Sequence, residues 1–290
     1  SVIGSTLALF GIIAVVVSTI LYFLIPYLVP TIVPGFTPAQ VHDTETLVYI
    51  LLFQPLLLGL SSIAASVVQA SRQFMLFALA PILYNVGIII GAVTLYPSLG
   101  IEGLAWGVVL GALLHFLVQV VPLIARGMPL SFALTRESII STMSLVVIPS
   151  LPRAVALMGN QALLIAFAAV ASIISVGAVS AMSLAFNLQS VPLTIIGVSY
   201  AAALFPALAL LASEGKRETF VNELWATARH IAFWLLPATM FIIVLRAHLV
   251  RVVLGTGAFS WEDTRLTAAI VALFSLSLVA QALILIFSRA

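Results

Sequence analysis

The sequence predicts an all-α protein that crosses a membrane several times. Of its 290 residues, 63% are hydrophobic and only 7% are charged, whereas a soluble domain has about 25% charged residues. Eleven Lys and Arg residues with nine Asp and Glu residues cannot cover the surface of a soluble fold of this length. In lipid only helices and closed barrels satisfy their own backbone. The apolar runs here are too long for barrel strands and lack their alternation, so helices are expected.

The composition also excludes several other classes of protein. The chain has no cysteine, so it can form neither a disulfide nor a thiolate metal site. Its net charge of +2 is too small and too scattered for a nucleic-acid-binding surface. The sequence shows no hydrolytic triad, phosphate-binding loop or metal-ligand cluster, and its four histidines are far apart. We therefore expect no enzyme activity, no metal and no cofactor.

Eight segments are long and apolar enough to be membrane spans, which need about 20 such residues. They are Thr6–Val29, Leu47–Gln69, Phe74–Leu95, Ile101–Ile124, Ile139–Ile173, Ala178–Leu211, Phe220–Leu245 and Thr264–Phe287. The fifth and sixth are longer than a bilayer is thick. Pro149 and Pro152 interrupt the fifth, and Pro192 and Pro206 interrupt the sixth. Because proline removes a backbone donor and kinks a helix, these two spans are expected to bend, tilt or extend beyond the hydrocarbon.

Polar segments between these spans predict the loops. The main ones are Val33–Thr46, Arg126–Ser138, Ser213–Thr219 and Arg246–Asp263. The second of them is the best candidate for a boundary between two four-helix lobes, 1–126 and 127–290, each of them incomplete. The chain begins with Ser1 and stops at Ala290 directly after an apolar segment. We therefore expect a fragment of a longer protein.

The distribution of basic residues predicts the orientation, because Lys and Arg are enriched in cytoplasmic loops. If the chain begins in the cytoplasm, seven basic residues lie inside and three outside. The inside set is Arg72, Arg126, Arg136, Lys216, Arg217, Arg229 and Arg289; the outside set is Arg246, Arg251 and Arg265. Both chain ends are therefore expected in the cytoplasm.

Arg153 is the strongest candidate for a functional residue. An arginine within a span costs about 3 kcal/mol on insertion scales, so it should face a cavity or a partner. Asn160 follows seven residues later on the same helical face, and Gln161 flanks that face. A cation with two amides suits anionic phosphate and sugar hydroxyls. The alternative is that Arg153 lies close to the cytoplasmic interface and extends its guanidinium into water.

A second polar stripe follows in the next span. Ser180, Ser183 and Asn187 are spaced three and four residues apart and therefore share a helical face. Gln189 points to nearly the opposite side, where a helix–helix contact is expected. The first stripe and this one are the candidate lining of a substrate cavity.

Several other residues are candidates for bending or joining helices. Pro152, Pro192 and Gly197 can make their helices easier to bend and so act as hinges. Alternatively, they merely accommodate the packing of neighbouring helices. Asn85, four residues after Pro81, can bond the carbonyl freed by that proline. We expect a structural role for Asn85.

Two further patterns indicate helix packing. His115 and Gln119 lie one turn apart inside a span, where hydrogen bonds between helices explain them better than substrate contact. Gly103, Gly107 and Gly111 form a GxxxGxxxG run on one face, which lets a neighbouring helix approach closely.

The order and spacing of several motifs resemble the MurJ/MviN family of lipid II flippases. The stretch Phe53–Pro122 is similar to the family's Pro-led helix, its AP-x3-N helix and a small-residue helix ending in Q-x-x-P. Val33–Phe36 resembles a periplasmic PGF turn. Pro152–Gln161, Ser175–Ala209 and the segment 254–268 (LGTGAFSWEDTRLTA) then follow in family order. The resemblance covers essentially the whole chain.

This resemblance implies a two-lobed, MATE-like fold of the MOP exporter superfamily around a central cavity in the bacterial cytoplasmic membrane. It implies movement of lipid II, a lipid-linked peptidoglycan precursor needed for the cell wall and cell shape, by alternating access. The partners implied are lipid II and membrane lipids, and the coupling ion is left open. The eight spans match the family's third to tenth of fourteen. Helices with essential arginines and an aspartate, and the pair that forms a groove for the lipid tail, are outside this chain.

One departure from the family pattern concerns Asn187, where the family often has a cavity-facing arginine. Arg153 is a candidate for the compensating cation on the neighbouring helix. Two alternatives to lipid II transport stay open. One is another exporter of the superfamily, for a polysaccharide lipid or a drug. A drug-cation exporter would want acidic residues well inside its spans, and Glu102 sits only at a span end. The other is a non-transporting membrane scaffold, which the loss of that arginine would favour.

Overall fold

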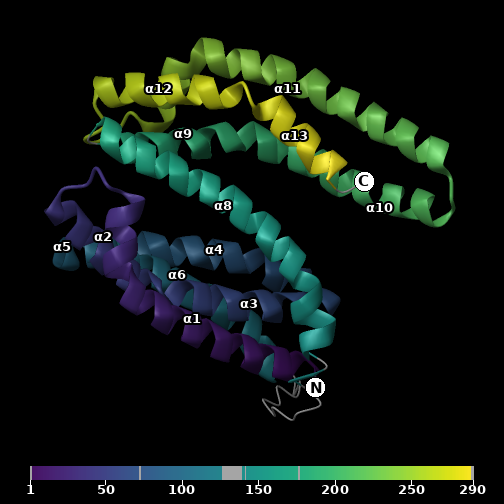
Figure 1. The fold of residues 1–290 in the computed structure, drawn as a ribbon, viewed down its shortest axis with the longest axis horizontal. Helices are drawn as coiled ribbons and strands as arrows, with labels where there is room; N and C mark the ends of the chain where they lie inside the picture. The colour runs from purple at the N-terminus through teal and green to yellow at the C-terminus, as the bar shows by residue number, and fades with distance from the viewer. Residues whose placement is uncertain (1, 72, 126–138, 141, 176, 289–290) are drawn as a thin grey trace. The chain divides into compact units, whose positions relative to one another are not determined.

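The computed structural model describes residues 2–71, 73–125, 139–140, 142–175 and 177–288. Nearly all of them lie in helices, and they group into two compact units, Ser1–Ile173 and Ile174–Ala290 (Figure 1). The expectation of an all-α, polytopic membrane fold is confirmed. The expected division into lobes at residues 126 and 127 stays a prediction, because segment 126–138 lies outside the described residues.

The first unit is built mainly from long apolar helices. In chain order they are α1 (Val2–Ile32), α2 (Pro38–Leu51), α3 (Phe53–Ala70), α4 (Phe74–Ile90), the π-helical turn η1 (Gly91–Leu95), α5 (Tyr96–Leu99), α6 (Ile101–Ala125), the π-helical turn η2 (Met143–Val147) and α8 (Ile148–Ile174). Helices α3, α4 and α6 pack on one another, and Ala64, Val68 and Leu123 form part of the core between α3 and α6.

The second unit packs its helices around two apolar clusters. Its elements are α9 (Ala178–Pro192), the π-helical turn η3 (Leu193–Val198), α10 (Ser199–Ser213), α11 (Arg217–Leu254), α12 (Trp261–Ser275) and α13 (Leu278–Phe287). One cluster joins α10, α11 and α13 and includes Leu208, Ile231 and Ile286. The other joins α9, α11 and α12 through Ala185, Val250 and Val271.

Six helical segments among the described residues are long and apolar enough to cross a membrane, and the bent pair α12 and α13 would make a seventh. Eight were expected. The difference lies in Ile139–Ile173, whose described part forms η2 and α8 and contains two shorter apolar stretches, Met143–Pro152 and Gln161–Ile174. The sixth predicted span, Ala178–Leu211, is one long apolar segment in which η3 follows Pro192 directly.

The loop predicted over Val33–Thr46 is mostly wrong, because α2 begins at Pro38. Thr37 and Gln40 form a capping box: the Gln40 backbone N–H donates to Thr37 Oγ1 (3.4 Å), and the Thr37 backbone N–H donates to Gln40 Oε1 (2.9 Å). Proline at the first helical position adds to this start signal. Hydropathy alone placed the helix start too late, because the first turns of α2 are polar.

The boundaries near the C-terminus also differ from the expectation. Helix α11 continues to Leu254, so the first half of the loop predicted over Arg246–Asp263 is helical. The last predicted span is divided into α12 and α13, with a bend of 42° between them. No proline lies at this break. Instead, Ser275 Oγ donates to the Val271 carbonyl (2.6 Å) and Ser277 Oγ donates to the Phe274 carbonyl (2.7 Å), and such side-chain bonds to the preceding turn bend helices.

Glycines allow the backbones of α4 and α6 to approach each other closely. A Cβ at Gly107 would lie 2.6 Å from the Gly91 Cα, and one at Gly87 would overlap with the backbone of Gly111. The GxxxGxxxG run on α6 therefore meets Gly87 on α4 and Gly91 at the start of η1 rather than larger side chains. The backbones touch directly, as small residues allow in membrane helices.

Candidate functional site

The first candidate stripe lies on α8. Arg153 and Asn160 are helical, but their side chains lie outside the described part of the structure, while the Gln161 side chain is exposed. Most of the described α8 residues are exposed, and only Ala171 and Ser172 are buried. The helix thus offers an open surface along most of its length. Pro152 lies inside α8 without interrupting it.

The second candidate stripe lies on α9. Ser183 and Asn187 are both exposed on one face, while Ala181, Ala185 and Gln189 are buried on the other. Ser183 Oγ donates to the Val179 carbonyl (2.9 Å), which leaves the hydroxyl oxygen at the exposed face. As predicted, Gln189 points away from Asn187 into the helix packing, and it is only 1% exposed.

The two stripes belong to different units, the first to Ser1–Ile173 and the second to Ile174–Ala290. Ser183 and Asn187 lie on an exposed face of α9, whereas on α8 Gln161 is the member of the first stripe whose side chain is described. The assembly of the two stripes into one substrate cavity stays a prediction.

The other predicted structural residues have defined surroundings. Gly197 lies in η3 and is buried, and a Cβ there would lie 3.1 Å from the Cβ of Ala282 on α13. Asn85 Nδ2 donates to the carbonyl of Pro81 itself (2.8 Å). The carbonyl freed by a proline is that of the residue four positions earlier, so the acceptor predicted for Asn85 was wrong. The hinge roles of Pro152, Pro192 and Gly197 stay predictions.

A polar cluster inside the first unit extends what the sequence indicated at His115. Ser61 Oγ lies 2.7 Å from His115 Nδ1 and also donates to the His115 carbonyl (3.1 Å), which joins α3 to α6. Gln54 Nε2 donates to the Tyr84 hydroxyl (2.9 Å), and the Tyr84 ring meets the His115 ring edge to face. Gln119, by contrast, is 1% exposed and has no hydrogen-bond partner among the described residues. The interhelical bond expected for His115 is present, and the one expected for Gln119 is not.

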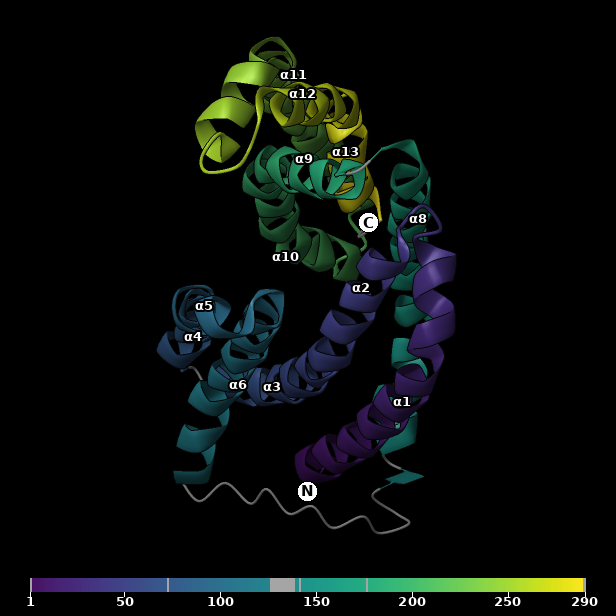
Figure 2. The ribbon, with the colours of Figure 1, turned by 90° about the vertical axis from the view of Figure 1, so that its left-hand side faces the viewer.

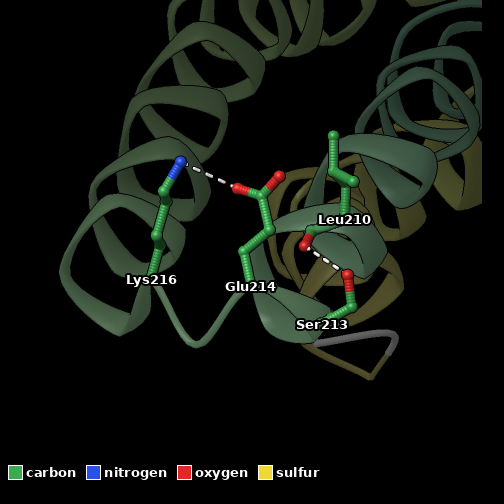
Figure 3. A network of polar contacts seen from close by, with 4 residues as sticks. All are labelled: Leu210, Ser213, Glu214 and Lys216. Carbon is green, nitrogen blue, oxygen red and sulfur yellow. Dashed lines mark hydrogen bonds and ion pairs between the residues drawn. The ribbon is translucent and has the colours of Figure 1, made fainter.

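The most charged predicted loop is a tight turn between α10 and α11. Lys216 Nζ lies 2.8 Å from Glu214 Oε2, and Ser213 Oγ donates to the Leu210 carbonyl (Figure 3). Both charged side chains are largely exposed, so the ion pair contributes little to stability. The position of this charged turn suits the water-facing ends of the two spans that it joins. Among the described residues, no group of three His, Asp or Glu side chains could hold a metal ion.

Comparisons with known proteins agree with one another. The family model described as lipid II flippase MurJ matches residues 1–290. A probable lipid II flippase MurJ of Bdellovibrio bacteriovorus is 30% identical over 217 residues, covering 73% of this chain and 40% of that protein. The lipid II flippase MurJ of Burkholderia cenocepacia is 28% identical over 242 residues, covering 80% of this chain and 46% of that protein.

A solved structure described as lipid II flippase MurJ in an inward closed conformation matches the fold. Its TM-score is 0.83 at 20% identity, over 99% of this chain and 59% of that one. The chain spans about half the length, or less, of these two curated relatives.

Proposed function

This chain belongs to the MurJ family of lipid II flippases, and on this premise we propose that it is part of a transporter that moves lipid II across the cytoplasmic membrane by alternating access. The observation that supports this most strongly is the family match over residues 1–290. The long apolar helices agree with a multi-pass membrane protein. The fold likeness to a MurJ structure covers nearly the whole chain.

The proposed roles follow from the chemistry of the headgroup. A pyrophosphate is anionic and must leave water during the crossing, so a cation and amide groups in the cavity lower the barrier. In our proposal Arg153 binds the phosphates. Asn160 and Gln161 on the same helix, with Ser183 and Asn187 on α9, bind the remaining oxygens and sugar hydroxyls. The prenyl tail stays in lipid.

The proposed orientation has both chain ends in the cytoplasm. The excess of basic residues on one side supports it. In this orientation the turn with Glu214 and Lys216 faces the cytoplasm. The α1–α2 turn and the end of α8 both face outward.

Replacement of Arg153 by alanine in the full-length gene tests the proposed cavity. We expect Arg153→Ala to abolish the rescue of a strain depleted of its own lipid II flippase, because the pyrophosphate would lose the cation that is proposed to bind it in the cavity. The matched control is Arg265→Ala, which removes an exposed arginine near the start of α12. Rescue by Arg153→Ala, at equal amounts of membrane protein, would remove Arg153 from the mechanism.

A further inference from the structure

The turn between α1 and α2 lies against the C-terminal end of α8. The Gly35 backbone N–H donates to Ser172 Oγ (3.2 Å), although the two residues are 137 positions apart. A Cβ at Gly35 would overlap with the backbone carbonyl of Ser172, so only glycine allows this approach. Both Figure 1 and Figure 2 show the α1–α2 turn beside this end of α8.

This contact coincides with the buried part of α8. Among the described residues of the helix, only Ala171 and Ser172 are buried. Leu151, Val155 and Met158, nearer the other end, are more than half exposed. Within α8 itself, therefore, burial is confined to the end at Ser172, and the nearest buried residue before the helix is Thr142, which precedes η2.

The position of the contact relates it to the candidate cavity residues. Ser172 lies 19 residues after Arg153 on one helix, which at 1.5 Å per residue places the two about 28 Å apart along the helix axis. That is nearly the thickness of the hydrocarbon core of a bilayer. A movement that frees the Ser172 end would therefore change the tilt of the whole helix and shift Arg153 at the far end.

We propose that Gly35 and Ser172 form a releasable latch that holds the outward-facing end of α8, and that α8 moves when the latch opens. One hydrogen bond and one backbone contact are weak enough to break and re-form during a transport cycle. The role of the latch in transport rests on the proposed function, because alternating access requires one end of the cavity to open while the other closes.

Cysteine reactivity tests the latch, because the chain has no cysteine of its own. The experiment uses the full-length protein, with any other cysteine replaced, in open membrane fragments that a polar maleimide reaches from both sides. Ser172→Cys reports on the buried position. Ser175→Cys, in the exposed turn just after α8, reports on access to this end of the helix.

We expect Ser172→Cys to react completely but at least about tenfold more slowly than Ser175→Cys. Adding Gly35→Ala should raise the rate at Ser172→Cys by about tenfold, because the added Cβ would overlap with the Ser172 backbone carbonyl and remove the backbone contact that remains after Ser172 Oγ is replaced. The matched control is Gly11→Ala in α1, where an added Cβ would meet only Leu60 Cδ2 at 4.0 Å. This control should leave the rate unchanged.

Three results would overturn the latch. Equal rates at Ser172→Cys and Ser175→Cys would mean that the contact does not form in the membrane. No reaction at Ser172→Cys, while Ser175→Cys reacts fully, would mean that the contact is permanent packing. An unchanged rate after Gly35→Ala would mean that the turn does not hold α8. Because labelling requires no transport, these results are independent of whether the protein moves lipid II.

Discussion

Two hydrogen-bonded pairs of polar side chains inside the first unit join different helices. Ser61 and His115 link α3 to α6, and Gln54 and Tyr84 link α3 to α4. In a membrane these bonds hold helices together where the hydrophobic effect cannot. The sequence indicated His115 because a histidine inside a span needs a partner. It did not identify that partner, because Ser61 is one of many serines and only the packing of α3 against α6 selects it.

Removal of the Ser61 hydroxyl should weaken this pair. We expect Ser61→Ala to lower the free energy of unfolding by about 1 kcal/mol, the usual size of one interhelical hydrogen bond in a membrane protein. Thermal unfolding of the purified full-length protein in detergent measures this. The control is Ser66→Ala on the same helix, whose exposed hydroxyl donates to the Ser62 carbonyl one turn earlier. An equal loss in both variants would contradict a specific role for the Ser61–His115 pair.

At the scale of helices, small residues and caps determine where elements begin, bend and touch. The apolar runs alone predicted the existence of most of the described spans, because about 20 apolar residues have few other uses. They did not predict the start of α2 at Pro38, which depends on the Thr37–Gln40 capping box. Nor did they predict the break between α12 and α13, because serines that bond back to the preceding turn are common in unbroken helices as well.

The α4–α6 contact gives a prediction at this scale. Gly107→Ala should destabilise the first unit by about 1–3 kcal/mol, because the added Cβ would lie 2.6 Å from the Gly91 Cα and the two helices must separate. Gly159→Ala is the matched control, since nothing lies within 4 Å of the Cβ that it would add. Unfolding in detergent compares the two variants. A Gly107→Ala protein as stable as the control would show that the backbone at Gly91, directly after α4, does not contact α6.

At the scale of the whole molecule, the family match over residues 1–290 assigns the chain to the MurJ family more strongly than any single residue does, and the fold agrees with it. The shared exposed face of Ser183 and Asn187 on α9 could be predicted from spacing, because helical periodicity determines which residues share a face. The stripe on α8 stays a prediction. Whether the two stripes meet in one cavity could not be predicted from spacing, because the contact between helices far apart in sequence depends on the whole assembly. The contact between Gly35 and Ser172 could not be predicted from the sequence either, because a glycine in a turn does not indicate which other segment packs against it.

The most direct test of the proposed function is the exposure of lipid II on the outer face of the membrane. The full-length gene is expressed in cells depleted of their own flippase, and the fraction of lipid II that an externally added lipid II-cleaving enzyme can reach is measured. We expect this fraction to return to the level of undepleted cells, and to fall again with Arg153→Ala. Lipid II that stays inaccessible, while the protein is present in the membrane at a normal level, would contradict lipid II transport and favour another exported lipid or a scaffold.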